Sequence, residues 1–451
     1  MSSIRYAPAV LLGLVVCACA VKPPPSEVVL PEIAPQSQPR VAAPCQPPPA
    51  ARCVAVVPLG KDASAVDLAT VMGDDLVRSE RFVALRDLDF PERPTDPDHV
   101  DYARWQQRGV EYLVLTEAKE QRTSRFWLLD VAQRKTLLAH DLRRFTSAER
   151  RLIAHEASDL VTEQLTGVRG LASTSIAYIT RVDRRGKPEY HLVVADADGG
   201  NAVVVANSRE PLLSPAWSPD AGQLAYMGYE RGPSSIFVVD LKTGSVRKLI
   251  SESSGAGAPA WSPDGRRLAF TLHGRSGSDV YIVDIATGAR RQLTHAPGIN
   301  TEAAWSPDGR TIAFTSDRDG QPRAYAVNAD GGAPRLLTRA GKQTLRPTYS
   351  PDGRTMALVV LEGGRYRIGL LRLETGALEM LSEGKEDEAP SFAPNGAMLI
   401  YSAQGAKAGV GELRLVSTDG NIRQKLAADT DVREAAWSPY PWSDLRLTTT
   451  Q

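Results

Sequence analysis

Four cysteines are the residues of this chain with the clearest capacity for covalent chemistry. Cys45 and Cys53 lie eight positions apart, and the sequence is equally compatible with a disulfide between them and with two free thiols. Val16-Cys17-Ala18-Cys19 resembles a bacterial lipobox, in which Cys19 would be acylated. The competing interpretation is that Ala18-Cys19-Ala20 is a signal-peptidase cleavage site. Both interpretations place the mature chain outside the cytoplasm.

The remaining polar residues do not form a recognisable catalytic or metal-binding motif. The chain has six histidines, and it contains neither G-x-S-x-G nor H-E-x-x-H. Asp196-Ala197-Asp198-Gly199 resembles the start of a calcium loop but lacks the distal glutamate, so it predicts a hairpin turn. We interpret His155 as a solvated or packed histidine on a helix, without a catalytic role. The sequence therefore predicts a protein that is not an enzyme and that has no cofactor or metal.

The overall charge excludes one further class of function. Lysine and arginine number 53, and aspartate and glutamate also number 53, so the formal net charge is zero. A protein that binds nucleic acid by neutralising phosphates would carry a basic excess. We therefore expect no nucleic-acid partner.

A short motif occurs six times and organises most of the chain. It reads GAPAWSPDG at residues 257–265 and TEAAWSPDG at residues 301–309, and the six copies are 43 to 45 residues apart. Such a regular period is the signature of a repeat architecture. The aromatic residues at the centre of the copies are Trp217, Trp261, Trp305, Tyr349, Phe392 and Trp437.

Each repeat carries the pattern of four short strands. The Ser-Pro-Asp-Gly turn follows the aromatic, and three alternating apolar runs follow the turn, which is typical of a β-propeller blade. Residues 175–205 supply three strands with no opening strand, and Trp437 ends an opening strand that has no successors. These parts complete one blade, so we predict six blades closed by the C-terminal strand.

A different pattern precedes the repeats. Residues 1–20 read as a signal peptide, residues 21–51 as a Pro-rich linker, residues 52–170 as an α/β domain, residues 171–442 as the propeller, and residues 443–451 as a tail. In the α/β domain we predict helices over residues 66–79 and 99–108, and a third with Ser147 as its N-cap and Gly167 at its end. The predicted fold class is α+β multidomain.

The loops that enter the innermost strands should form a ring at the mouth of the propeller channel. These loops differ from blade to blade and mix apolar residues with charges that include Glu302, Arg346, Glu388 and Arg433. Such a mixture is typical of a protein interface. We therefore predict a protein-binding mouth.

The combination of domains resembles a known family. Val54-Ala55-Val56-Val57-Pro58, Gly257-Ala258-Pro259-Ala260, Asn300-Thr301-Glu302 and Ala436-Trp437-Ser438-Pro439-Tyr440 are similar to motifs of TolB, the periplasmic propeller family of the Tol–Pal system. The resemblance covers about 390 residues, nearly everything after the linker, as the span of these motifs in the sequence shows.

This resemblance implies a non-enzymatic periplasmic adaptor, and a closed propeller would have no need of a dimer, so we expect a monomer. The mouth would bind Pal, the peptidoglycan-associated lipoprotein, and the N-terminal region would bind TolA, in support of outer-membrane integrity and cell division. The matching mouth positions are Ala258, Asn300, Thr301 and Glu302. Two alternatives are the gating domain of a prolyl-oligopeptidase-like hydrolase and an unrelated scaffold that is anchored through a lipid on Cys19.

Overall fold

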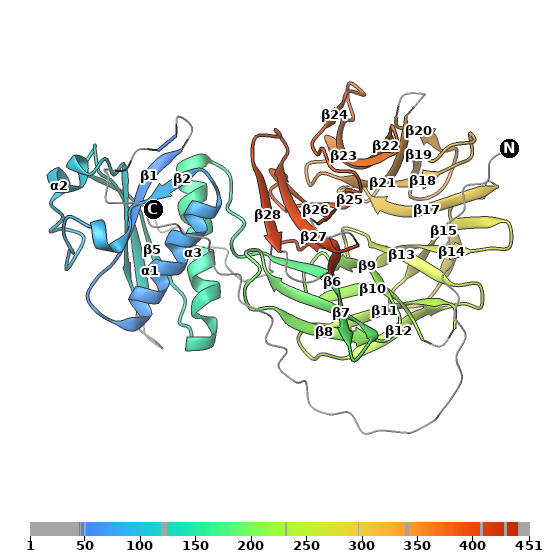
Figure 1. Cartoon of the computed structure of the whole chain (residues 1–451), viewed down its shortest axis with the longest axis horizontal. Coiled ribbons are helices and arrows are strands. Elements are labelled where there is room, and N and C mark those ends of the chain that lie inside the picture. Colours follow the sequence, from blue (N-terminus) through green and yellow to red (C-terminus); the bar gives the residue numbers. More distant parts are fainter. Residues whose placement is uncertain are drawn as a thin grey trace. The chain divides into compact units, whose positions relative to one another are not determined.

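The computed structural model describes residues 45, 47–48, 51–118, 124–230, 232–295, 297–338, 342–405, 409–427 and 431–440. All of them belong to one unit of the chain, Glu32–Gln451. The predicted signal peptide, most of the linker, Cys19 and the tail lie outside the described residues. Within the unit, an α/β domain is followed by a series of antiparallel sheets, which we call the propeller region (Figure 1).

The α/β domain is built on a five-stranded sheet with the order β2-β1-β3-β4-β5. The first three strands pair in parallel, and the last three pair antiparallel. The strands are β1 (Arg52–Pro58), β2 (Phe82–Ala84), β3 (Tyr112–Glu117), β4 (Ser124–Asp130) and β5 (Lys135–Leu142). The helices are α1 (Ala63–Arg78), η1 (Asp87–Asp89), α2 (Tyr102–Gln107), η2 (Ser147–Glu149) and α3 (Arg150–Thr166).

Both faces of this sheet are covered. On one face, α1 and α3 pack side by side and bury Leu68, Met72 and Ile153 against alternate residues of the strands. On the other face, α2 places Trp105 over Cys53 and its neighbours. This arrangement explains why β1 is apolar at nearly every position, since its side chains are buried on both sides.

The boundaries of the third helix only partly match the sequence prediction. Gly167 ends α3 in the left-handed conformation, with φ of 74°, as predicted. The N-cap prediction was wrong by one residue, because Thr146 and not Ser147 caps the first turn. Thr146 and Glu149 form a capping box, and such a reciprocal pair satisfies two free backbone amides at once.

A disulfide joins Cys45 and Cys53 and attaches the end of the linker to β1. The amide of Cys45 also donates to the carbonyl of Arg108, at 3.0 Å. Cys45 packs with the cluster around Trp105, on the face of the sheet opposite α1 and α3. The linker therefore joins the domain on its α2 side.

The propeller region contains four four-stranded sheets and one eight-stranded sheet in the described part of the chain. The eight-stranded sheet consists of two four-stranded halves that β15 and β17 join in parallel over Gly277 and Ser278. In chain order the strands are β6 (Ser175–Arg184), β7 (Lys187–Asp196), β8 (Val203–Ser208), β9 (Leu212–Trp217), β10 (Gln223–Tyr229), β11 (Ser234–Asp240), β12 (Val246–Ser251), β13 (Ala256–Trp261), β14 (Arg267–His273), β15 (Gly277–Asp284), β16 (Arg290–Gln292), β17 (Gly298–Trp305), β18 (Thr311–Ser316), β19 (Arg323–Asn328), β20 (Arg335–Leu336), β21 (Gln343–Tyr349), β22 (Thr355–Glu362), β23 (Arg365–Arg372), β24 (Leu378–Met380), β25 (Glu388–Phe392), β26 (Met398–Gln404), β27 (Gly411–Ser417), β28 (Arg423–Ala427) and β29 (Asp431–Trp437).

The last strand completes the first sheet, as predicted from the unmatched strands at the two ends. β29 pairs antiparallel with β6, and Trp437 lies opposite Ile176. The indole of Trp437 donates to the hydroxyl of Thr174, at 2.8 Å. The sheet β29-β6-β7-β8 therefore has no unpaired edge at β6.

The repeated motif joins neighbouring sheets. The indole nitrogens of Trp217, Trp261 and Trp305 each donate to a carbonyl of a neighbouring opening strand, at 3.0–3.2 Å. The repeated aspartate stays within its own turn: Asp264, for example, accepts from the hydroxyl of Ser262 and the amide of Arg266. The motif is therefore structural, and the variable positions around it are the candidates for function.

Candidate functional site

Each opening strand contains a bulge at an equivalent position. In each of them one non-glycine residue has a φ between 48° and 56°, and the pairing with the next strand shifts at this point. A bulge turns its side chains out of the regular alternation, and a positive φ costs free energy in any residue other than glycine. The residues are Ser214, Ala258, Glu302, Arg346, Ala389 and Glu434.

Three of these bulge residues form a charged bridge. The guanidinium of Arg346 lies 3.1 Å from the carboxylate of Glu302 and 2.9 Å from that of Glu434. Glu434 also accepts from the amide of Ser214, at 2.6 Å, and Glu302 accepts from the hydroxyl of Thr315, at 2.8 Å. Residues from widely separated repeats thus meet at one place.

The bridge changes the acidity of its members. The negative charge of Glu434 raises the pKa of Arg346. Burial alone would raise the pKa of Glu434, but Arg346 reverses that effect and the net pKa is lowered. Arg346 and Glu434 are therefore both charged.

Glu388 completes what we call the mouth cluster: Glu302, Arg346, Glu388 and Glu434. Glu388 is exposed as a residue, but the surrounding protein removes part of its water and raises its pKa. Arg346 lowers this pKa, whereas Glu434 and Glu302 raise it. The mouth cluster thus sets three carboxylates against one guanidinium, which leaves an excess of negative charge.

The structure separates the predicted mouth residues into two groups. Glu388 and Arg433 are exposed, and Ala258 and Thr301 are half-buried, so all four are accessible to a partner. Glu302 and Arg346 are engaged with each other. Arg433 also contacts Asp431, at 2.9 Å, which holds its side chain in place.

Asn300 lies where a partner could not reach it. It is fully buried, and its amide donates to the carbonyl of Ser278, at 3.1 Å. Its oxygen accepts from Ser316, at 2.8 Å, and from Arg318, at 3.0 Å. This network joins the two halves of the eight-stranded sheet, which is a structural role that the sequence prediction missed.

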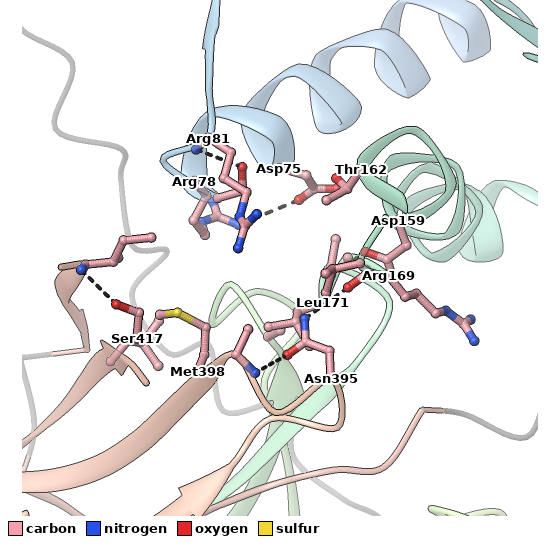
Figure 2. A pocket seen from close by; sticks show the side chains of 18 of the residues that line it. Asp75, Arg78, Arg81, Asp159, Thr162, Arg169, Leu171, Asn395, Met398 and Ser417 are labelled. Carbon is pink, nitrogen blue, oxygen red and sulfur yellow. Dashed lines mark hydrogen bonds and ion pairs between the residues drawn. The ribbon is translucent and has the colours of Figure 1, made fainter. Parts of the chain in front are cut away.

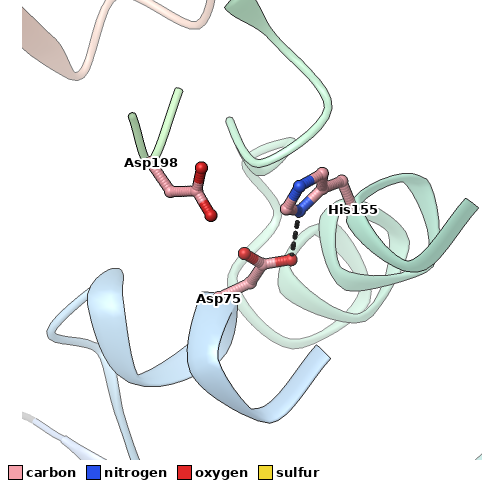
Figure 3. Close-up of side chains that lie close together, drawn as sticks. All are labelled: Asp75, His155 and Asp198. Atoms are coloured by element: carbon pink, nitrogen blue, oxygen red, sulfur yellow. Dashed lines mark hydrogen bonds and ion pairs between the residues drawn. The ribbon is translucent and has the colours of Figure 1, made fainter. Parts of the chain in front are cut away.

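A second charged group, the interdomain cluster, joins the α/β domain to the first sheet of the propeller region. His155 on α3 is 2% exposed, and its Nδ1 lies 2.7 Å from Asp75 on α1 (Figure 3). Its Nε2 lies 3.5 Å from Asp196, at the end of β7. The cluster consists of Asp75, Arg78, Arg151, His155, Asp196 and Asp198.

Two arginines complete the interdomain cluster. Arg151 pairs with Asp196, at 3.1 Å, and with Asp198. Arg78 lies 3.1 Å from Asp198. Three carboxylates therefore face two guanidinium groups, and the charges balance when His155 is protonated.

The pKa of His155 agrees with this balance. Burial alone lowers it, but contacts with Asp196 and Asp75 prevail and raise it to about 9. His155 is a packed helix histidine, one of the two forms predicted from the sequence, but its ion pairs with Asp75 and Asp196 were not predicted. Asp196 and Asp198 were predicted only as turn residues. Their pairing with Arg78 on α1 and Arg151 on α3 could not be read from the neighbouring sequence.

Asp75, His155 and Asp198 each place a potential ligand atom within 4.8 Å of the others, as a metal site would require. However, Asp75 already accepts from Nδ1 of His155, and Asp198 already pairs with Arg78 and Arg151. A dication would have to compete with these positive charges. The donor set therefore suits an ion-pair network better than a metal.

Beside the interdomain cluster lies a cavity of about 210 Å³ (Figure 2). Its walls come from α1, α3, the segment after α3 and the strands β26 to β28. Across it, Gln424 donates to the carbonyl of Arg78, at 2.9 Å, and Asn395 donates to that of Arg169, at 3.0 Å. We call this space the interdomain pocket.

The comparisons with known proteins follow this division into domains. A family model described as the TolB amino-terminal domain matches residues 47–137, and one described as the TolB beta propeller domain matches residues 162–441. The chain belongs to the TolB family. Its fold is accordingly the propeller-type fold of TolB with an α/β domain in front.

Individual TolB proteins match along most of their length. The chain is 53% identical over 401 residues to the Tol-Pal system protein TolB of Nitrosococcus oceani, which covers 86% of this chain and 91% of the relative. It is 51% identical over 397 residues to the corresponding protein of Thioalkalivibrio sulfidiphilus, with the same coverage. The crystal structure of TolB from Acinetobacter baumannii aligns with a TM-score of 0.78 and 34% identity, covering 88% of this chain and 98% of that one.

Membership of the TolB family decides two points about function. The protein is a component of the Tol–Pal system, and it is not an enzyme. The hydrolase alternative is thereby excluded. Among the described residues, no helix has the length and apolar character needed to cross a membrane.

Proposed function

We propose that this protein is a periplasmic adaptor of the Tol–Pal system that binds Pal through the mouth of a six-bladed propeller. The proposal rests chiefly on the mouth cluster, where three carboxylates face one arginine. Glu388 and Arg433 are exposed, the charges of the bridge act on Glu388, and Arg433 directly precedes Glu434 in the chain. A fixed, unbalanced charge pattern favours one partner orientation and speeds association.

The adaptor role requires a second contact. We propose that the N-terminal region, with the Pro-rich residues 21–51, binds TolA, and that the adaptor supports outer-membrane integrity and constriction during division. An extended, tethered segment suits a partner at a distance. We further propose domain limits of 52–170 and 171–442, and a monomer, since a closed ring leaves no free sheet edge.

The proposal is tested by calorimetry of the mature chain with the periplasmic domain of Pal from the same organism. Thr301→Arg and Glu388→Gln should each weaken binding about tenfold, or about 1.4 kcal/mol. Glu302→Arg is unsuitable, because it would place a second cation beside Arg346 and disturb the fold. Glu374→Gln, at an exposed position away from the opening strands, is the matched control.

Three outcomes are informative. Loss of binding in both mouth variants, with the control unchanged, supports the adaptor and the site. Binding that survives both substitutions contradicts the mouth as the site, and no binding by the wild type contradicts Pal as the partner. A separate titration of TolA with and without residues 21–51 tests the second contact.

The means of retention in the periplasm is a separate question. A mature chain that begins at Cys19 with a diacylglycerol would be an outer-membrane lipoprotein, whereas cleavage after Ala20 would release a soluble protein. Mass spectrometry of the mature N-terminus distinguishes them. We propose the soluble form, and an acylated Cys19 would contradict it.

A further inference from the structure

The interdomain pocket lies at the point where the described chain ends. Trp437 lines the pocket, and so do Arg169 and Gly170. Three residues after Trp437, the hydroxyl of Tyr440 donates to the carbonyl of Gly170, at 2.8 Å, and Arg169 stacks on the Tyr440 ring, at 4.1 Å. We propose that the C-terminal segment, residues 441–451, docks into this pocket and inserts Trp442.

The size of the pocket fits an indole. An apolar cavity of roughly 150 Å³ is enough to bind benzene, and the volume here is about 210 Å³. Apolar side chains supply much of the wall, and Leu171 and Met398 are among those labelled in Figure 2. The apolar residues that line it include Val168, Leu171, Ala172, Met398, Leu415 and Ile422.

The reach of the segment is short. Trp442 follows Tyr440 by two positions, a span of at most about 7 Å in an extended chain. Pro441 restricts Tyr440 to extended conformations, which limits the directions the segment can take. A group tethered so closely has an effective concentration in the millimolar range, so a contact with a dissociation constant below that range would be occupied.

Charge complementarity favours the same occupant. Arg81 lines the pocket with an exposed side chain and has no ion-pair partner among the described residues. Arg78, by contrast, is already paired with Asp198. Asp444 follows Trp442 by two positions and supplies the carboxylate that Arg81 lacks.

The linker is the main competing occupant, and the structure disfavours it. The linker enters at Cys45, which the disulfide holds on the α2 face of the sheet. The pocket is lined by residues of α1 and α3, on the opposite face. Residues 22–44 also contain no aromatic side chain to fill the cavity.

The test is ¹⁹F NMR of the mature full-length chain labelled with 5-fluorotryptophan. The chain has seven tryptophans, so seven signals are expected, and Trp442→Phe assigns one of them. We expect the Trp442 signal to be shifted from the free amino acid and to show little solvent isotope shift. Met398→Arg should move it to the free position, whereas Leu336→Arg, on an exposed part of β20, should not.

A second substitution protects the test against misfolding. Trp105 and Trp305 are buried and do not line the pocket. If Met398→Arg also shifts their signals, the substitution has disturbed the fold, and Ile422→Arg is used instead. A Trp442 signal at the free position in the wild type would overturn the proposal. So would a shifted signal that neither pocket substitution moves, or one that moves only when residues 22–44 are deleted.

Discussion

The two charged clusters of this protein differ in their balance. The interdomain cluster sets three carboxylates against two arginines and the protonated His155, and its members pair with one another. The mouth cluster sets three carboxylates against Arg346 alone. A balanced, buried group holds parts of a chain together, whereas an unbalanced one at an opening is prepared for a ligand. Carboxylate and guanidinium groups therefore hold the two domains together in the interdomain cluster and are available to a partner in the mouth cluster.

The largest expected effect comes from removing the cation of the mouth cluster. Arg346→Met should lower the free energy of unfolding by about 3 kcal/mol, because two half-buried carboxylates lose their partner. Urea unfolding measures this loss. Arg372→Met, which breaks an exposed pair with Glu379, is the matched control and should cost less than about 1 kcal/mol.

A rescue experiment checks the cause. Adding Glu302→Gln and Glu434→Gln to Arg346→Met removes the unpaired charges and should restore most of the lost stability. Stability that remains low would mean that the side-chain packing of Arg346, and not its charge, supports the mouth.

The next effect concerns the pH dependence of the interdomain cluster. The folded-state pKa of His155 is about 9, above its ordinary value of 6.5, so its contribution to stability is complete below pH 6.5. That contribution is lost as the pH rises through about 9, at a cost of about 3 kcal/mol. Urea unfolding between pH 6 and 10 follows the loss.

His155→Gln isolates this contribution from other titrations. The variant should be less stable than the wild type at pH 6.5, and the difference should shrink as the pH approaches 10. A constant difference across this range would show that His155 is neutral in the folded protein and that the cluster is not balanced.

The smallest expected effect on stability is at Glu388. Since this exposed side chain has no close ion pair in the described part of the chain, Glu388→Gln should change the free energy of unfolding by less than about 0.5 kcal/mol. The loss of Pal affinity expected above would then be separate from folding. A large loss of stability would place Glu388 among the structural charges and remove the contrast between the clusters.

The repeat made the fold predictable, but it hid part of the site. The aromatic spacing gives the order of the strands and the closure by β29, because each repeat must bury the same faces. The bulges were not predictable, since residues such as Glu302 and Arg346 give no sign of a positive φ. Asn300 was predicted to face a partner, but it is buried. A position that varies between the repeats can be buried as readily as exposed, even when it lies beside the recurring motif.

The interdomain cluster escaped prediction because its parts are far apart along the chain. His155 and Asp75 are separated by 80 residues, and Arg151 and Asp196 by 45. Periodicity reports which face of an element is buried, but not which charged group faces it from another domain. The balance of three acids and three bases becomes visible only when the two domains are seen together.

The closing strand has a consequence for biosynthesis. Trp437 and Thr174, which meet in the first sheet, are 263 residues apart in the sequence. Since a chain is made and exported from its N-terminus, β6 remains without this partner until the strands from β7 to β28 have been delivered. Contacts of such long range slow the last step of folding and leave a bare strand edge in the meantime. Nascent chains that stop before β29 should therefore be targets for chaperones and proteases.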